Sequence, residues 1–158
     1  MNERVKELID ILELQPHPEG GFYKETYRSD QVLDNDRNLM TSIYFLITGR
    51  NMSRLHRIKS DELWYFHEGS TLSIHTLDHN GYRCIKLGRD INSNEQPFAL
   101  VQGNTIFGSN LENESEESYA LVSCGVAPGF DFRDFELFTA DDLLKDYPEH
   151  EEIIRQLT

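Results

Sequence analysis

Between residues 22 and 137 the chain alternates apolar and polar positions in short runs, the pattern expected of β-strands with one buried face. Turn-forming pairs separate the runs. Asn80-Gly81 is the strongest hairpin signal, because a type I′ turn needs positive φ at both central positions. About ten short strands at this spacing, with no helix between them, predict a sandwich or a small barrel. The predicted strands cover residues 22–28, 39–47, 54–58, 62–67, 71–77, 82–87, 98–101, 105–107, 119–126 and 132–137.

Helical periodicity is confined to the two ends of the chain. Asn2 can cap a helix over residues 3–14, in which apolar residues recur at positions 5, 8, 9 and 12. The tail is predicted to be helical over 140–146 and 149–156, with a break at Pro148. No linker or internal repeat divides the chain, so we expect a single domain over residues 1–158.

Acidic residues dominate the charge of the protein. The formal net charge is −13, with 28 Asp and Glu against 15 Lys and Arg. Binding to nucleic acid needs a basic surface, so the charge argues against a nucleic acid partner. No apolar run reaches the ~20 residues of a membrane span, and the charged N-terminus is unlike a signal peptide. We therefore expect a cytoplasmic protein without a membrane partner, and its cysteines, Cys84 and Cys124, are expected to be reduced.

The segment from residue 49 to residue 69 carries the strongest candidate chemistry. It is predicted to form a strand, a turn and a second strand, an antiparallel pair that would bring His56 and Glu62 face to face. His56 shares a strand face with Ile58, and Glu62 shares one with Trp64. An imidazole facing a carboxylate could bind a metal, form an acid–base dyad, or be a buried pair that satisfies itself. The pattern alone leaves these three alternatives open.

The same segment resembles a known family motif. Gly49, His56, Glu62 and Gly69 follow the first cupin motif with one extra residue before the histidine, and Gly103 is what remains of the second motif. The whole chain is similar to the fifth cupin group, a domain of unknown function, and this resemblance rests on residues 17–23, 41–46, 56–64 and 126–135. The resemblance implies a mainly β fold, a double-stranded β-helix (RmlC-like jelly-roll cupin barrel) flanked by short N- and C-terminal helices. It also implies a homodimer.

Typical metal-binding cupins use three histidines and one glutamate, and this chain departs from that set. The second histidine position holds Ile58, and the third holds Ile106. His67 has the opposite strand parity to Glu62, so it should point away. Two side chains rarely hold a transition metal against water. We therefore expect no cofactor, and a divalent metal at His56 and Glu62 is the less favoured alternative.

The favoured functional hypothesis is a binding protein. The barrel would bind a small, sugar-like molecule without a tightly held metal, with aromatic walls formed by Trp64, Phe66 and Phe107. A storage or stress role without chemistry is a further alternative, because cupins include such proteins.

The alternative is an enzyme, and the sequence does not decide whether the protein is one. The barrel resembles in outline the cupin-fold epimerases that act on sugar nucleotides, which use a histidine base and a tyrosine acid. His56 would be the base, Glu62 or Asp61 would orient it, and Tyr44 or Tyr65 would supply the acid. The cation that stabilises an enolate, or contacts the ligand, would be Lys59 or Arg57.

Two further features are interpreted as structural. Phe130, Phe132 and Phe135 are expected to anchor the last strand or a subunit interface. Gly20 and Gly21 are interpreted as turn residues.

Overall fold

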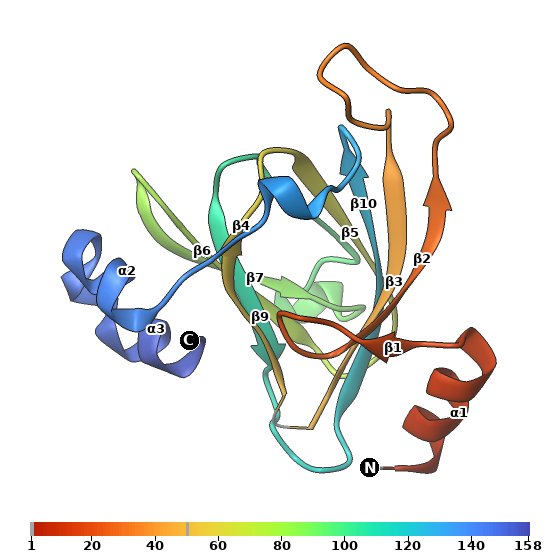
Figure 1. Ribbon diagram of the computed structural model, residues 1–158. Helices are drawn as coiled ribbons and strands as arrows, with labels where there is room; N and C mark the ends of the chain where they lie inside the picture. The colour runs from red at the N-terminus through yellow and green to blue at the C-terminus, as the bar shows by residue number, and fades with distance from the viewer. Residues whose placement is uncertain (1, 50) are drawn as a thin grey trace.

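The computed structural model describes residues 2–49 and 51–158. Two antiparallel sheets face each other and form a barrel (Figure 1), so the predicted mainly β jelly roll is confirmed. One sheet has six strands in the order β1 (Gln15–Pro16), β2 (Phe22–Arg28), β3 (Thr41–Thr48), β10 (Tyr119–Ala127), β5 (Asp61–Gly69) and β8 (Phe98–Val101). The other has five, in the order β11 (Glu136–Leu137), β4 (Met52–Arg57), β9 (Ile106–Leu111), β6 (Leu72–Asp78) and β7 (Gly81–Leu87).

The main core lies between the two sheets and follows the strand period of two. Alternate residues of each strand point inward, so that Phe45 and Trp64 of one sheet meet Phe107 of the other. All three side chains are 1% exposed. This packing fills much of the barrel with apolar groups, and the buried polar residues line a cavity at one end of it.

Helix α1 (Glu3–Leu12) covers the outer face of the six-stranded sheet. Val5 and Leu8 pack against Leu46 and Leu121, and the Asn2 side chain caps the helix by accepting a hydrogen bond from the backbone N–H of Val5 (2.8 Å). The helix predicted over residues 3–14 is thus confirmed except for its last two residues.

Helices α2 (Ala140–Asp146) and α3 (Glu151–Gln156) cover the outer face of the five-stranded sheet, at the left of Figure 1. A short 3₁₀ turn, η3 (Pro148–His150), joins them. Leu143 and Ile154 pack onto Leu55, Leu77 and Ile106 of the sheet. Both ends of the chain therefore stabilise the barrel from outside, in agreement with the predicted flanking helices.

The strand predicted over residues 132–137 is mostly wrong. Residues Phe132–Asp134 form a 3₁₀ turn, η2, and only Glu136–Leu137 pair with β4 as β11. The segment from β10 to β11 crosses one end of the barrel (Figure 1). The side chain of Asp131 caps the turn by accepting a hydrogen bond from the backbone N–H of Arg133 (2.9 Å). This local bond stabilises a turn in a sequence whose aromatic residues suggested a strand.

The predicted pairing of the two central strands is also wrong. Strand β4 pairs with β9 and β11, whereas β5 pairs with β10 and β8, so the two strands lie in opposite sheets. His56 and Glu62 therefore face each other across the interior rather than along one ladder.

The β6–β7 hairpin forms as predicted, but with another turn. Asp78 pairs with Gly81, which leaves His79 and Asn80 as the loop. Gly81 has φ +102°, whereas Asn80 is not among the residues with positive φ, so the turn is not type I′. The Asp78 carboxylate accepts a hydrogen bond from the backbone N–H of Asn80 (2.8 Å), which supports the turn instead.

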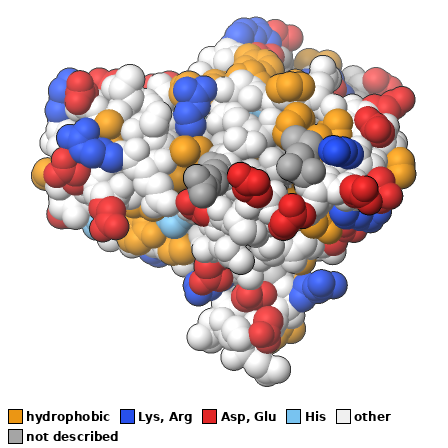
Figure 2. Space-filling view, turned by 90° about the horizontal axis from the view of Figure 1, so that it is seen from below, with side chains coloured by type: hydrophobic (Ala, Val, Ile, Leu, Met, Phe, Trp, Pro, Cys, Tyr) orange, Lys and Arg blue, Asp and Glu red, His pale blue; other side chains and the backbone are white. Residues whose placement is uncertain are grey.

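The remaining short 3₁₀ turn, η1 (Ile91–Ser93), lies between β7 and β8. Within the described residues no helix is long and apolar enough to cross a membrane. Acidic side chains are spread over the face shown in Figure 2, with basic ones among them.

Candidate functional site

A cavity of about 460 Å³ opens at the end of the barrel that the β10–β11 segment crosses. Volumes of this size are typical of small-molecule sites. Its wall combines charged, aromatic and apolar side chains: Gln15, His17, Glu19, Tyr23, Glu25, Arg28, Thr41, Ile43, His56, Ile58, Glu62, Cys124, Val126, Phe130, Asp131 and Phe132.

The loop over residues 17–21 lies directly on strand β4 and carries part of the wall. The backbone N–H of Arg54 donates to the carbonyl of Glu19 (2.9 Å), and the Arg54 guanidinium donates to the carbonyl of Pro18 (2.7 Å). Gly20 has φ +112°, and a Cβ there would lie 2.0 Å from the carbonyl oxygen of Met52. Only glycine permits both this backbone conformation and this approach, so it fixes Glu19 next to β4.

Glu19 and His56 form the central polar pair of the cavity. His56 Nε2 lies 3.0 Å from Glu19 Oε2, and Ser53 Oγ donates to Glu19 Oε1 at 2.8 Å. The His56 ring packs against the rings of Phe107 and Phe135, with centroid distances of 4.2 and 5.3 Å. The Glu19 and His56 residues are 7% and 3% exposed, so the pair is held away from bulk water.

The hydrogen bonds of His56 restrict where its protons lie. Nδ1 lies 2.6 Å from the carbonyl oxygen of Arg54, and a carbonyl can only accept, so Nδ1 carries a proton. Nε2 then either donates to an ionised Glu19 or accepts from a protonated one. In both cases one proton lies between the two groups and their summed charge is zero. The proton can therefore shift between Nε2 and the Glu19 carboxylate without a change in the orientation of the ring.

Glu62 extends from the opposite sheet and is buried. Burial raises its pKa to about 8, and the negative charge of Glu19 adds to this shift. Burial also raises the pKa of the Cys124 thiol, which contacts Glu62 and lines the same wall. Glu62 is therefore mainly a neutral carboxylic acid at pH 7, able to donate a hydrogen bond into the cavity.

Aromatic residues form the rim. The rings of His17 and Tyr23 meet edge to face at 4.5 Å, and those of Phe130 and Phe132 at 4.8 Å. Burial lowers the pKa of His17, so its imidazole is neutral at pH 7. Phe132 is 52% exposed and still lines the cavity, which gives the rim an open aromatic face.

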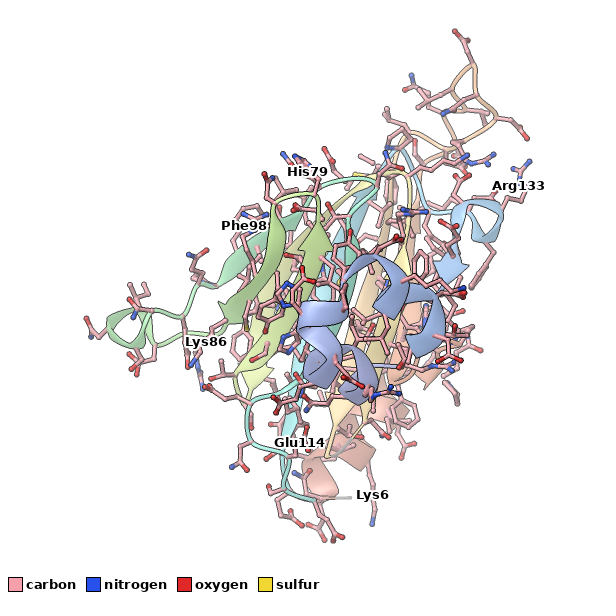
Figure 3. All side chains as sticks on the ribbon, turned by 90° about the vertical axis from the view of Figure 1, so that its left-hand side faces the viewer. Lys6, His79, Lys86, Phe98, Glu114 and Arg133 are labelled. Carbon is pink, nitrogen blue, oxygen red and sulfur yellow. The ribbon has the colours of Figure 1, made fainter. Side chains whose placement is uncertain are left out.

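Ion pairs fasten the rim to the β2–β3 loop. Arg37 forms a bidentate pair with Asp134 (2.7 and 2.9 Å). Arg133 projects from the η2 turn beside that loop (Figure 3), where it pairs with Asp131 (2.8 Å) and Asp36 (3.2 Å). These contacts hold Phe132 in place at the rim.

The structure brings together the residues at the centre of the sequence-based hypothesis. His56, Ile58 and Glu62 all line the cavity, as strand parity predicts. His67 bonds Ser123 and meets Tyr44 on the outer face, so the prediction that it points away is confirmed.

The expected acid and cation lie elsewhere. Tyr44 packs in the outer cluster beneath α1, because its neighbours Ile43 and Phe45 face inward. Tyr65 lies on the outer face as well, 46% exposed against Phe98. The side chain of Lys59 is 72% exposed and lies 3.5 Å from Asp134. None of these expected placements in the cavity is correct.

The other two supporting candidates also lie outside the cavity. Asp61 accepts a hydrogen bond from the backbone N–H of Gly103 and does not orient His56. Arg57 pairs with Glu136 at 2.8 Å on the outside of β4.

The expected aromatic walls lie deeper than the cavity. Trp64 and Phe107 belong to the buried core and Phe66 packs against it; Phe107 reaches the site through its contact with His56. Ile106 faces the outer cluster under α2 and α3, so the equivalence of this position with a third histidine ligand is wrong. On β9 the residue next to Ile106, Phe107, faces the barrel interior instead.

The donor set does not fit the three-histidine, one-glutamate metal site of typical cupins. Ile58 places an alkyl group in the wall, and both ring nitrogens of His56 already have protein partners. Over residues 2–49 and 51–158 no three His, Cys, Asp or Glu side chains converge as a metal site.

Sequence reasoning missed Glu19, His17, Tyr23 and Arg28, and it assigned Phe132 elsewhere. A usable signal was present, because a His-x-Glu triplet runs directly into two glycines. Paired glycines often mark a close approach of two backbones, and here that approach carries Glu19 to His56.

Comparison with known proteins places the fold and the family. Residues 6–138 match the family described as Cupin superfamily (DUF985). The uncharacterized protein YML079W of Saccharomyces cerevisiae is 27% identical over an alignment of 157 positions, and the match covers 89% of this chain and 78% of the yeast protein. The crystal structure of protein SO0799 from Shewanella oneidensis has a TM-score of 0.91 at 42% identity, covering 97% of this chain and 96% of that one.

Two further solved structures have a similar fold, one at high and one at low sequence identity. A hypothetical protein from Leishmania major has a TM-score of 0.89 at 40% identity, with 97% of each chain covered. The oxalate decarboxylase OxdC of Bacillus subtilis has a TM-score of 0.59 at 16% identity, covering 92% of this chain and 37% of that one. The decarboxylase shares the fold alone. The chain belongs to the Cupin superfamily (DUF985) family.

Proposed function

For this member of the Cupin superfamily (DUF985) family, we propose that the cavity binds a small, polar, sugar-like molecule without a tightly held metal. The His56–Glu19 pair and Glu62 form hydrogen bonds with the ligand, and Phe132 contacts it at the rim. The observation that carries the proposal is the 3.0 Å contact of His56 Nε2 with Glu19, buried opposite a neutral carboxylic acid. Buried polar groups that face a cavity are suited to ligand recognition, because ligand atoms can replace water as hydrogen-bond partners.

A ligand screen with a cavity-filling variant tests the binding function. Wild type, Ile58→Phe and Tyr65→Ser are compared by thermal shift and native mass spectrometry against neutral and charged small metabolites. Ile58 lines the cavity, whereas Tyr65 is exposed on the outer face, so only the first substitution should abolish the shifts. Ligands that bind Ile58→Phe as well as wild type would place binding outside the cavity and contradict the proposal.

A second candidate is proton transfer, as in an isomerase. It is favoured by the placement of two acid–base groups on opposite walls, His56 on β4 and Glu62 on β5. The His56–Glu19 pair would take a proton from a carbon beside a carbonyl onto a free lone pair of the Glu19 carboxylate, and Glu62 would donate its own proton to the carbonyl oxygen. Incorporation of solvent deuterium into neutral keto and aldo sugars should occur with wild type and stop in His56→Ala. Exchange that survives in His56→Ala would refute the role of the His56–Glu19 pair as the base.

The proposed absence of a tightly held metal has its own test. Protein purified without a metal-affinity tag should contain well below one metal per chain by elemental analysis. Stoichiometric iron, manganese or zinc that is lost in His56→Gln would contradict this part of the proposal.

The homodimer and the cytoplasmic location predicted from the sequence remain part of the proposal. Light scattering coupled to size exclusion should give twice the chain mass of 18.4 kDa. Fractionation of the source cells should recover the protein with cytoplasmic markers.

A further inference from the structure

The charges of the cavity wall cancel, and this restricts the class of ligand. Four carboxylates line the cavity: Glu19, Glu25, Glu62 and Asp131. Three of them have a cationic or proton-sharing partner within 3.0 Å, and the fourth is neutral through burial. Only the charges of the cavity wall cancel in this way, since the protein as a whole carries a formal charge of −13.

Glu19, Glu25 and Asp131 each have a separate partner. Glu19 shares a proton with His56 at 3.0 Å, so that pair sums to zero in either protonation state. Glu25 pairs with Arg28 at 2.6 Å. Asp131 pairs with Arg133 at 2.8 Å, and this guanidinium holds the pKa of Asp131 well below its usual range.

Among the described residues that line the cavity, no positive charge is left unpaired for an anion. Of the described residues in the cavity wall, Arg28 alone is a lysine or arginine. Its guanidinium already has hydrogen-bond partners within the protein. It donates to Glu25, to the side-chain oxygen of Asn38 (2.9 Å) and to the carbonyl of Phe130 (3.2 Å). A phosphate or diphosphate would therefore enter a neutral wall inside a strongly negative molecule. An ammonium group would find each carboxylate already neutralised.

The remaining groups suit a ligand with one polar and one apolar face. Glu62 can donate a hydrogen bond, and the hydroxyl of Tyr23 and the amide of Gln15 lie in the same wall. Phe132 offers a half-exposed ring at the rim, on which the C–H face of a saturated ring can pack. Sugars and cyclic polyols combine a hydroxyl edge with such a face.

We propose that the ligand is an uncharged, hydroxyl-bearing ring compound, a neutral sugar or cyclic polyol, and not a sugar nucleotide or another anion. This inference rests on the proposed function and specifies the ligand of the same cavity. It departs from the sugar-nucleotide alternative suggested by the sequence.

Matched probes test the ligand class directly. Neutral hexoses, pentoses and inositols are compared with their phosphorylated, carboxylated and amino counterparts by ligand-observed NMR at low ionic strength. At least one neutral member should bind about tenfold or more tightly than its charged counterparts. Tighter binding of a charged counterpart, or no binding of any neutral member, would overturn the inference.

Two single substitutions at the mouth should reverse the selectivity. Glu25→Gln leaves Arg28 uncompensated and should favour the phosphorylated and carboxylated probes. Arg28→Gln leaves Glu25 uncompensated and should favour the amino probes. Both side chains are about two-fifths exposed, so neither change should unfold the barrel. The exposed Glu116→Gln serves as the matched control and should leave the order of affinities unchanged.

The outcomes separate this inference from the proposed function. Charged probes that bind wild type best, and lose binding in Ile58→Phe, would overturn the neutral ligand class while the cavity remains the binding site. Selectivity that stays the same in Glu25→Gln and Arg28→Gln would likewise contradict the role of charge cancellation.

Discussion

Replacing Glu62 with glutamine should flatten the pH dependence of stability. The folded-state pKa of about 8 lies above the ordinary value of 4.5, so the folded protein binds more protons than the unfolded chain between these two values. A raised carboxyl pKa makes its stabilising contribution at low pH, and this contribution is lost as pH rises towards 8. Glutamine has nearly the same shape and no charge, so it should remove this effect and keep the packing.

The size of the effect follows from the two pKa values. Linkage gives a loss in the free energy of unfolding of about 2.5 kcal/mol between pH 5 and pH 7, and about 1.4 kcal/mol more by pH 9. Other groups also titrate, so the measured quantity is the difference between the wild-type and Glu62→Gln curves, taken from urea denaturation at each pH. Glu116→Gln, on an exposed loop, should run parallel to wild type. Parallel curves for wild type and Glu62→Gln would refute the buried, neutral state of Glu62.

Three further substitutions test the construction of the site. Glu19→Ala should lower the free energy of unfolding by about 3 kcal/mol in urea denaturation, because it leaves His56 buried without its partner; a loss below ~1 kcal/mol would mean that the pair is not held as described. Gly20→Ala should lower the melting temperature well beyond Gly81→Ala, since both positions have positive φ but only Gly20 has a backbone atom in the place of the new Cβ; equal losses would contradict the close docking of the loop. Phe132→Ala should weaken binding of a ring ligand about tenfold by titration calorimetry, with the urea midpoint unchanged; unchanged affinity would remove Phe132 from the site.

The fold was predictable because many weak signals agree. Alternation identified most strands, and Asn2 with its apolar periodicity identified α1. Pairing between strands was harder, because sequence neighbours usually pair and β4 and β5 do not. The interior of a barrel brings residues together across sheets, and periodicity along one strand carries no information about the opposite wall.

The site was predictable only in part, for a related reason. His56 and Glu62 were found because their strand faces are apolar and inward. Glu19 was missed because it lies on an irregular loop, where no period applies and position depends on the contact of Gly20 with β4. Phe132 was misassigned because the Asp131 cap turns the chain at a place where aromatic content favours a strand.

Methyl NMR of isoleucine tests directly whether the cavity around His56 and Glu19 is the ligand site. Ile43 and Ile58 line the cavity, whereas Ile11 and Ile91 are 74% and 71% exposed and serve as internal controls. Titration with neutral sugars and cyclic polyols should shift the δ1-methyl signals of Ile43 and Ile58 and leave those of Ile11 and Ile91 in place. Shifts confined to the two exposed isoleucines, or no shift at Ile43 and Ile58 across the whole neutral panel, would contradict the account.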